Sequence, residues 1–117
     1  MIEILRPDFE FEDDRGKLVQ LVNKGFKQVN VIETKAGVTR GNHYHKINKE
    51  AFYIIDGNIE LTLKKNSDKH IYKFNKGDMF LINEYVNHEF YFLSDTVLVS
   101  MYNNGVELDN GEKDIYT

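Results

Sequence analysis

Hydrophobic and polar positions alternate along most of this chain, in short runs. A period of two is typical of β-strands that bury one face. No segment keeps a period of about 3.6 residues for more than about two turns, so no helix is expected. The pattern predicts strands at residues 17–22, 27–34, 50–55, 58–63, 70–74, 79–82, 88–93 and 96–102.

Polar and glycine-containing turns separate these runs. Asp56-Gly57 lies between two alternating runs, and Asp-Gly in that position predicts a β-hairpin. Residues 103–117 are polar and contain glycine, so we expect an extended tail. About nine or ten short strands at close spacing indicate an all-β sandwich or barrel.

Length and composition favour one globular domain. The chain has 117 residues, which fits a single domain over residues 1–117 with one core. Hydrophobic residues make up 41% and charged residues 29%, a balance typical of folded rather than disordered chains. The net charge of -4 argues against nucleic acid as a partner, because nucleic-acid binders need a basic surface to displace counterions.

No feature of the sequence indicates a membrane partner or export. No apolar run approaches the roughly 18–20 residues that a transmembrane helix needs. Residues 1–6 lack the basic segment and the long apolar segment of a signal peptide, so we expect a cytoplasmic protein. The chain contains no cysteine, and any metal ion would have to be held by nitrogen and oxygen ligands.

Three of the four histidines, with one glutamate, form a candidate metal site. His43 and His45 are two residues apart, which on a strand puts both imidazoles on one face. Glu50 follows a polar stretch that can turn the chain, and His88 begins a later strand. Three imidazoles and one carboxylate suit Zn, Fe, Mn, Ni, Co or Cu and leave coordination positions open. The His43–His45 pair taken alone fits an ordinary hydrogen-bonded role equally well, and His70 is expected to be a surface residue.

The same residues carry a resemblance to the cupin family. Its first motif has a glycine, then a His-X-His pair, a glutamate and a second glycine. This chain matches every fixed position, with Gly37, His43, His45, Glu50 and Gly57. The resemblance implies a cupin double-stranded β-helix, which is a jelly-roll barrel. It also implies one divalent metal ion bound by His43, His45, Glu50 and the histidine of the second motif.

The second cupin motif is matched in part. Gly77 and His88 stand at its first glycine and its histidine. Asn83, Tyr85 and Phe92 replace its proline, its second glycine and its asparagine. The metal-ligating histidine of this motif is therefore retained as His88, while the proline and glycine that would form its turn are replaced.

Longer stretches narrow the resemblance. Residues 37–45 look like the cupin domain of capsular-polysaccharide enzymes that epimerise a keto sugar nucleotide. Residues 12–16 and 108–116 are similar to the opening and the ending of such domains and of nucleotide-sugar ketoisomerases and 3,5-epimerases. The resemblance implies an isomerase of surface-polysaccharide biosynthesis with a nucleotide sugar as its small-molecule substrate. In the related metal-free 3,4-ketoisomerases the His-X-His pair acts in proton transfer, so His43 and His45 are also catalytic candidates; His88 favours the metal-binding branch.

Epimerising a keto sugar requires a proton to be removed beside a carbonyl and then returned. Tyr44, Tyr53 and Tyr102 are candidate proton carriers. The parity of Tyr44 and Tyr53 predicts positions outside the barrel, whereas Tyr102 follows the last strand and could lie at a barrel mouth. Arg40 is a candidate clamp for a diphosphate, because a guanidinium fork matches phosphate oxygens. Arg15, beside Gly16, is a second substrate-binding candidate; both arginines also fit solvated turn positions.

Other functions remain open at this point. A metal-dependent dioxygenase or a small-molecule-binding cupin would use the same ligand set. A non-catalytic sugar sensor is a third alternative, but the sequence contains no effector segment that supports it. Phe52, Phe90 and Phe92 share faces with the ligands and predict a partly apolar pocket. Small barrels have exposed sheet edges, so we expect a homodimer.

Overall fold

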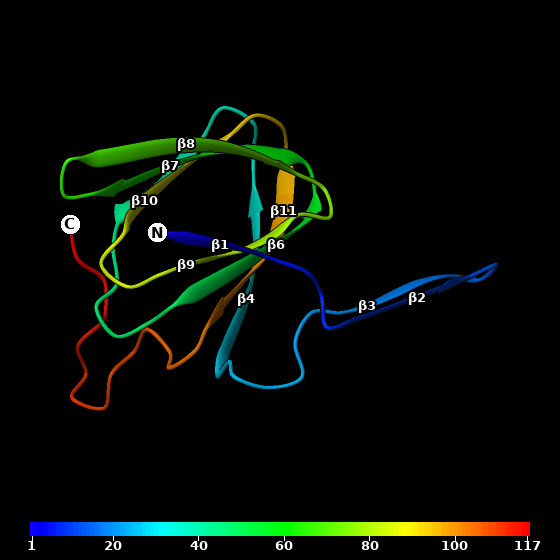
Figure 1. Ribbon diagram of the computed structural model, residues 1–117, viewed down its shortest axis with the longest axis horizontal. Helices are drawn as coiled ribbons and strands as arrows, with labels where there is room; N and C mark the ends of the chain where they lie inside the picture. Colours follow the sequence, from blue (N-terminus) through cyan, green and yellow to red (C-terminus); the bar gives the residue numbers. More distant parts are fainter.

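The computed structural model describes residues 1–117 and is all-β, as predicted (Figure 1). A five-stranded sheet has the order β1-β9-β6-β11-β4, a four-stranded sheet has the order β5-β10-β7-β8, and β2 pairs only with β3. The pairings within each sheet are antiparallel. The strands are β1 (Ile2–Leu5), β2 (Phe9–Asp13), β3 (Gly16–Gln20), β4 (Gln28–Thr34), β5 (Thr39–His43), β6 (Glu50–Asp56), β7 (Asn58–Lys65), β8 (Asp68–Asn75), β9 (Met79–Ile82), β10 (Asn87–Phe92) and β11 (Thr96–Tyr102).

The core lies between the two sheets. On β7, Ile59, Leu61 and Leu63 are fully buried while their neighbours are partly exposed, which is the alternation expected of a strand with one face inward. Residues of both sheets complete the cluster, including Phe52, Ile54, Phe80, Phe90, Phe92 and Leu98. Each such side chain contributes roughly 1.5–3 kcal/mol relative to exposure. Burial of apolar side chains in this core therefore explains why strands form where the sequence predicts them, at residues 50–55, 58–63, 79–82, 88–93 and 96–102.

The predicted hairpin at Asp56-Gly57 is wrong. β6 pairs with β9 and β11, whereas β7 pairs with β8 and β10, so the chain crosses from one sheet to the other here. Gly57 has φ 100°, and a Cβ at this position would lie within 3 Å of the Asp95 backbone oxygen. The glycine allows a close corner between the sheets.

A smaller apolar cluster covers the outer face of the five-stranded sheet. Ala51, Met79, Leu81, Val99 and Met101 are buried there. Leu21, Val22 and Phe26, from the connection between β3 and β4, pack against them, and Tyr53 joins from outside the barrel, as its parity predicts.

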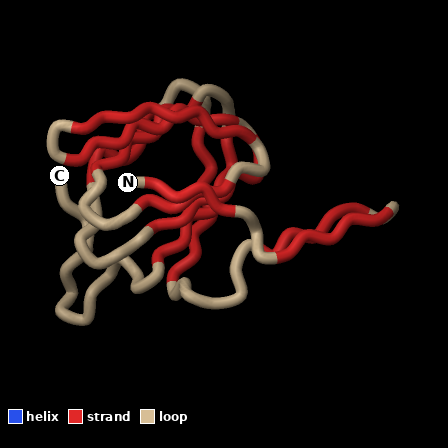
Figure 2. Tube along the Cα trace, viewed as in Figure 1, coloured by secondary structure: helices blue, strands red, loops and turns tan.

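The β2–β3 hairpin extends away from the barrel (Figures 1 and 2). Phe11 lies opposite Leu18, and Phe9 shares their face. These side chains are 52% (Phe9), 50% (Phe11) and 56% (Leu18) exposed. An isolated two-stranded hairpin is marginally stable in water, and this hairpin pairs with no other strand while its apolar face is exposed.

The tail differs from the extended segment that was expected. It bends back on the barrel through an isolated bridge between Tyr44 and Tyr116, and a second isolated bridge, between Glu107 and Lys113, joins two residues of the tail itself. Val106 and Asp114 are buried. No helix with the length and hydropathy to cross a membrane occurs in the structure.

Candidate functional site

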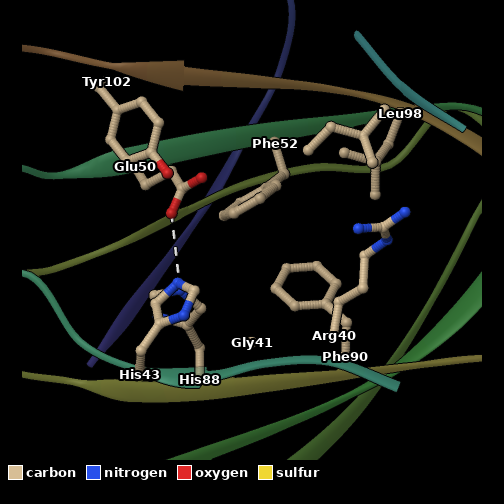
Figure 3. Close-up of a pocket in the computed structure, with 10 residues that line it drawn as sticks. Arg40, Gly41, His43, Glu50, Phe52, His88, Phe90, Leu98 and Tyr102 are labelled. Atoms are coloured by element: carbon tan, nitrogen blue, oxygen red, sulfur yellow. Dashed lines mark ion pairs between the residues drawn. The ribbon is translucent and has the colours of Figure 1, made fainter. Parts of the chain in front are cut away.

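A cavity of about 210 Å³ lies between the two sheets and is drawn in Figure 3. Strands β4, β5, β6, β10 and β11 all contribute to its wall. Half of its lining is hydrophobic, as the sequence predicted, although Phe92 belongs to the core behind it. The lining residues are Ile32, Arg40, Gly41, His43, Glu50, Phe52, His88, Phe90, Leu98 and Tyr102.

A bulge places His43 and His88 side by side. The two residues pair directly across β5 and β10, and the register shifts between His88 and Glu89. Gly41, next to the bulge, has φ 96°, and a Cβ there would lie 2.7 Å from the His88 backbone oxygen. Asn42 also has a positive φ, of 63°. The imidazole rings of His43 and His88 consequently meet edge to face, with centroids 4.7 Å apart.

His45 lies beyond the end of β5, not within a strand as the spacing suggested. Its Nδ1 lies 2.5 Å from the Asp114 backbone oxygen. A carbonyl oxygen only accepts, so Nδ1 carries the hydrogen of this bond. The opposite ring nitrogen, Nε2, lies 3.0 Å from Glu50 Oε1. His45 therefore presents Nε2 to Glu50, which lines the cavity.

Glu50 begins β6 and is 4% exposed. Its Oε1 lies 3.0 Å from His45 Nε2 and 3.5 Å from His88 Nε2, and Ser100 donates a hydrogen bond to its Oε2. Burial raises the pKa of this carboxyl, but the hydrogen bond to His45 and the electrostatic interaction with His88 outweigh it, so the pKa lies below its usual value. Glu50 is thus a buried carboxylate that needs a cation or proton donors around it.

The histidines differ in their affinity for protons. Burial lowers the pKa of His88 to about 4 and also lowers that of His43, where the charge of His45 adds to the effect. Burial likewise disfavours the charged form of His45, but its hydrogen bonds to Glu50 and Asp114 raise its pKa above the ordinary value. Two neutral imidazoles are therefore available as lone-pair donors at neutral pH.

The donor set fits a divalent cation. One nitrogen each of His43, His45 and His88 lies within 4.8 Å of the others. Metal–ligand bonds of about 2.0–2.2 Å place neighbouring ligand atoms about 3–4 Å apart, so the three nitrogens would have to move closer together to bind one ion. Glu50 Oε1 lies beside two of these three histidines, His45 and His88. His70 is exposed on β8 and takes no part.

Tyr102 and Arg40 also lie where a reaction could use them. Tyr102 lines the cavity, and its ring meets that of His45 edge to face at 5.2 Å. Burial raises the pKa of its hydroxyl, and the neighbouring charge of Glu50 raises it further. Arg40 Nε donates to Thr34 Oγ1 at 2.8 Å, which ties β5 to β4 at the cavity.

Arg15, Tyr44 and Tyr53 do not join this set. Arg15 lies at the hairpin turn, pairs with Asp13 and leaves its side chain 82% exposed. Tyr44 packs beside Tyr85 and Tyr116. Neither it nor Tyr53 lines the cavity.

Residue-by-residue reasoning missed three supporting residues. Ser100 is fully buried and holds Glu50. It is a polar residue at an inward position of an otherwise apolar strand, a signal that the sequence contains. The hydrophobic pattern marks neither Asn48 nor Asp114, both fully buried, because their partners are far apart in the chain, and Asp114 is marked only by the resemblance of residues 108–116.

Comparisons with known proteins agree with this architecture. A family model described as the polysaccharide biosynthesis C-terminal domain matches residues 11–116. No curated protein matches the chain.

Solved structures give the overall likeness. A 3,4-ketoisomerase from Helicobacter canadensis superposes with a TM-score of 0.80; it is 24% identical, and the match covers 94% of this chain and 87% of that one. A TDP-quinovose 3,4-ketoisomerase from Campylobacter jejuni also has a TM-score of 0.80, at 20% identity, with 97% of this chain and 92% of that one covered. A sugar 3,4-ketoisomerase from Thermoanaerobacterium thermosaccharolyticum, solved in complex with TDP, has a TM-score of 0.76 at 20% identity, covering 87% of this chain and 80% of that one.

Structures of dTDP-4-dehydrorhamnose 3,5-epimerases share the architecture as well. The likenesses confirm the cupin double-stranded β-helix and the resemblance to the ketoisomerase and epimerase group. At these identities they establish the fold, and the chemistry has to be argued from the cavity.

Proposed function

The chain belongs to the polysaccharide biosynthesis C-terminal domain family, and from this premise we propose that it is a sugar-nucleotide isomerase. The reaction would be an epimerisation or a ketoisomerisation of a keto-deoxy sugar, with proton transfer beside a carbonyl. One observation carries the proposal. In Figure 3, His43, His88, Glu50 and Tyr102 lie at one end of the cavity, Arg40 lies at the other, and the rings of Phe52 and Phe90 lie between them.

We propose that His43, His45, Glu50 and His88 hold one divalent metal ion. Such an ion would act as a Lewis acid toward the carbonyl oxygen of the substrate. The protein supplies the rest of the chemistry. Tyr102 can hold a proton at its hydroxyl, because a tyrosine is protonated at neutral pH and burial raises its pKa further. Phe52 and Phe90 exclude water from the space in which the sugar would react.

Arg40 is the proposed clamp for the diphosphate of the substrate. Its Nε is engaged by Thr34, and this contact orients the guanidinium while its two terminal nitrogens stay free for phosphate oxygens. A structurally similar ketoisomerase was solved with TDP, which supports a nucleotide-linked substrate for this chain. Nucleotide sugars are made in the cytoplasm, where we place the protein.

We further propose a homodimer in which the β2–β3 hairpin of each copy covers the other. Phe9, Phe11 and Leu18 form one exposed apolar face on the hairpin. Val29 and Val31, on the edge strand β4, are 59% and 66% exposed and lie opposite Met101 and Val99 of the outer-face cluster. A two-fold axis would let each hairpin cover the other copy's β4 and close the assembly. Sedimentation of wild type beside Phe11→Ser tests this, and a monomeric wild type contradicts it.

Two measurements test the function. Plasma mass spectrometry on untagged protein should find near one equivalent of metal in wild type and little in His88→Ala. Incubation with nucleotide-linked 4-keto sugars in deuterium oxide should exchange a ring proton that NMR detects. Metal without exchange on any such sugar, together with oxygen consumption by the iron-loaded protein, would instead favour a metal-dependent dioxygenase.

A further inference from the structure

Residues 46–49 join two of the proposed ligands, His45 and Glu50, yet they belong to no strand. Both ends of this loop carry side chains that must meet at one point, since His45 Nε2 and Glu50 Oε1 are 3.0 Å apart. A free loop would let the His45 ring turn and drift. Something outside the loop must therefore fix its course.

Asp114 of the C-terminal segment fixes it from inside the protein. This residue is fully buried. Its carboxylate accepts hydrogen bonds from the backbone N–H groups of Lys46 at 2.9 Å, Ile47 at 3.0 Å and Asn48 at 3.0 Å. The Asn48 side-chain amide donates a fourth, at 2.9 Å. Four donors replace the water that burial removes, and they hold the pKa of Asp114 below its usual value against the effect of burial.

Asn48 ties the loop to the tail in the opposite direction. Its side-chain amide also donates to the Gly105 backbone oxygen at 2.8 Å. Its side-chain oxygen accepts from the backbone N–H groups of Asn104 and Gly105, each at 2.9 Å. Loop and tail are thus linked by side chains of both segments, and every one of these side chains is satisfied.

The main chain of Asp114 acts on the histidine itself. The Asp114 carbonyl oxygen accepts the Nδ1–H of His45 at 2.5 Å. The ring cannot rotate without breaking this bond, and Nδ1 is taken, so Nε2 is the nitrogen that faces Glu50. One residue therefore sets the path of the loop with its carboxylate and the orientation of the ring with its carbonyl.

We propose that Asp114 is the positioning residue of the metal centre, and that the C-terminal segment serves as a clamp that holds His45 in its ligating orientation. The inference rests on the proposed metal site and adds to it an element from the far end of the chain. Partners that orient a ligand histidine typically change metal affinity by 10–100-fold when they are altered.

Asp114→Asn is the test variant. It keeps the shape of the side chain but places an NH2 group opposite N–H donors that the carboxylate accepts. The control is Ile59→Ala, which removes a fully buried side chain of β7 that does not line the cavity. We expect Zn²⁺ affinity, measured by chelator competition, to fall 10–100-fold in Asp114→Asn and to stay within two-fold of wild type in Ile59→Ala. The visible spectrum of the Co²⁺-loaded variant should also change, because the ligand geometry changes.

Equal weakening in both variants would mean a general loss of stability and would overturn the proposal, as would unchanged affinity and spectrum in Asp114→Asn. If Asp114→Asn does not fold, hydrogen exchange in the wild-type protein tests the proposed clamp. Its backbone amides of residues 46–48 and the Nδ1–H of His45 should exchange slowly with deuterium, and rapid exchange there contradicts the clamp. This exchange needs no metal, so a wild type that binds no zinc refutes the proposed metal site while the clamp is still judged separately.

Discussion

The hydroxyl of Ser100, on β11, donates a hydrogen bond to Glu50 Oε2, on β6, at 2.5 Å. Ser100 is fully buried and Glu50 is 4% exposed, so no water can replace this donor. Ser100→Ala leaves a buried carboxylate oxygen without it, and we expect the free energy of unfolding of the metal-free protein to fall by about 1–3 kcal/mol. Urea denaturation measures this. Ser94→Ala, at a half-buried turn, is the control with a smaller expected loss, and equal losses would contradict the role given to Ser100.

A second prediction concerns the bulge beside His88. Gly41→Ala puts a Cβ 2.7 Å from the His88 backbone oxygen at φ 96°. We expect a loss of at least about 1–3 kcal/mol from the backbone conformation alone, with further loss from the contact. Gly37→Ala is the matched control, because its φ is 84° but no atom lies within 4 Å of its Cβ. Denaturation midpoints that coincide for the two variants would show that the bulge tolerates a side chain.

The third prediction concerns pH. Burial lowers the pKa of His88 to about 4 from 6.5, so the unfolded chain takes up this proton at a higher pH than the folded chain. The free energy of unfolding of the metal-free protein should therefore fall as pH drops from about 6.5 to about 4, by about 3 kcal/mol from this residue.

The histidines around His88 titrate as well, with His43 shifted in the same direction and His45 in the opposite one. The difference between wild type and His88→Leu isolates the contribution of His88. Thermal or urea denaturation across this pH range should give a steeper curve for wild type. Parallel curves would mean that His88 is protonated in the folded protein as readily as in the unfolded one.

A fourth prediction separates the two arginines. Arg40 lines the cavity, whereas Arg15 lies on the hairpin and pairs with Asp13. Arg40→Ala should weaken binding of a nucleoside diphosphate, measured by calorimetry, by roughly 10–100-fold, and Arg40→Lys should restore only part of it. Arg15→Ala should leave the affinity unchanged. A large effect of Arg15→Ala would assign the diphosphate to the hairpin instead.

The fifth prediction concerns Tyr102. Tyr102→Phe retains the ring that packs on His45 and removes only the hydroxyl. Deuterium exchange into a nucleotide-linked keto sugar should slow by about 100–10,000-fold, the usual contribution of a positioned acid or base. Metal content and substrate affinity should stay at the wild-type level. An unchanged exchange rate would remove Tyr102 from the proton-transfer step.

Much of this architecture could be predicted from local pattern. The alternation on β7 and the apolar runs of β6, β9, β10 and β11 identify strands, because burial of one face depends on neighbours along the chain. The ligand residues were recognisable since His43, His45 and Glu50 stand close together in sequence. Tyr85 stands at the position of the second glycine of the second cupin motif. Its φ of 63° is a conformation that glycine adopts readily, so the backbone there agrees with the motif.

Features that depend on distant partners could not be predicted. The local sequence Asp56-Gly57 predicts a hairpin. The chain instead forms a corner there, because β6 pairs with β9 and β11 and β7 pairs with β10, and all three partner strands lie farther along the chain. β1 is four residues long and acquires its place by pairing with β9 and by packing Ile2 and Leu5 against the two apolar clusters. The tail seemed extended because Asp114 is a polar residue among polar residues. Its burial follows from donors that precede it by more than 60 residues.

The β2–β3 hairpin shares no backbone pairing with either sheet of the barrel. A substitution at residues 9–20 therefore changes no backbone pairing of the strands that carry His88 and Glu50. The proposed assembly surface on the hairpin and the proposed metal ligands thus lie in separate stretches of the sequence. Substitutions can change one of them without changing the other. An arm of different length or charge could be grafted at residues 9–20 to change which copies associate, while Leu21 and Val22, which pack against the barrel, are kept.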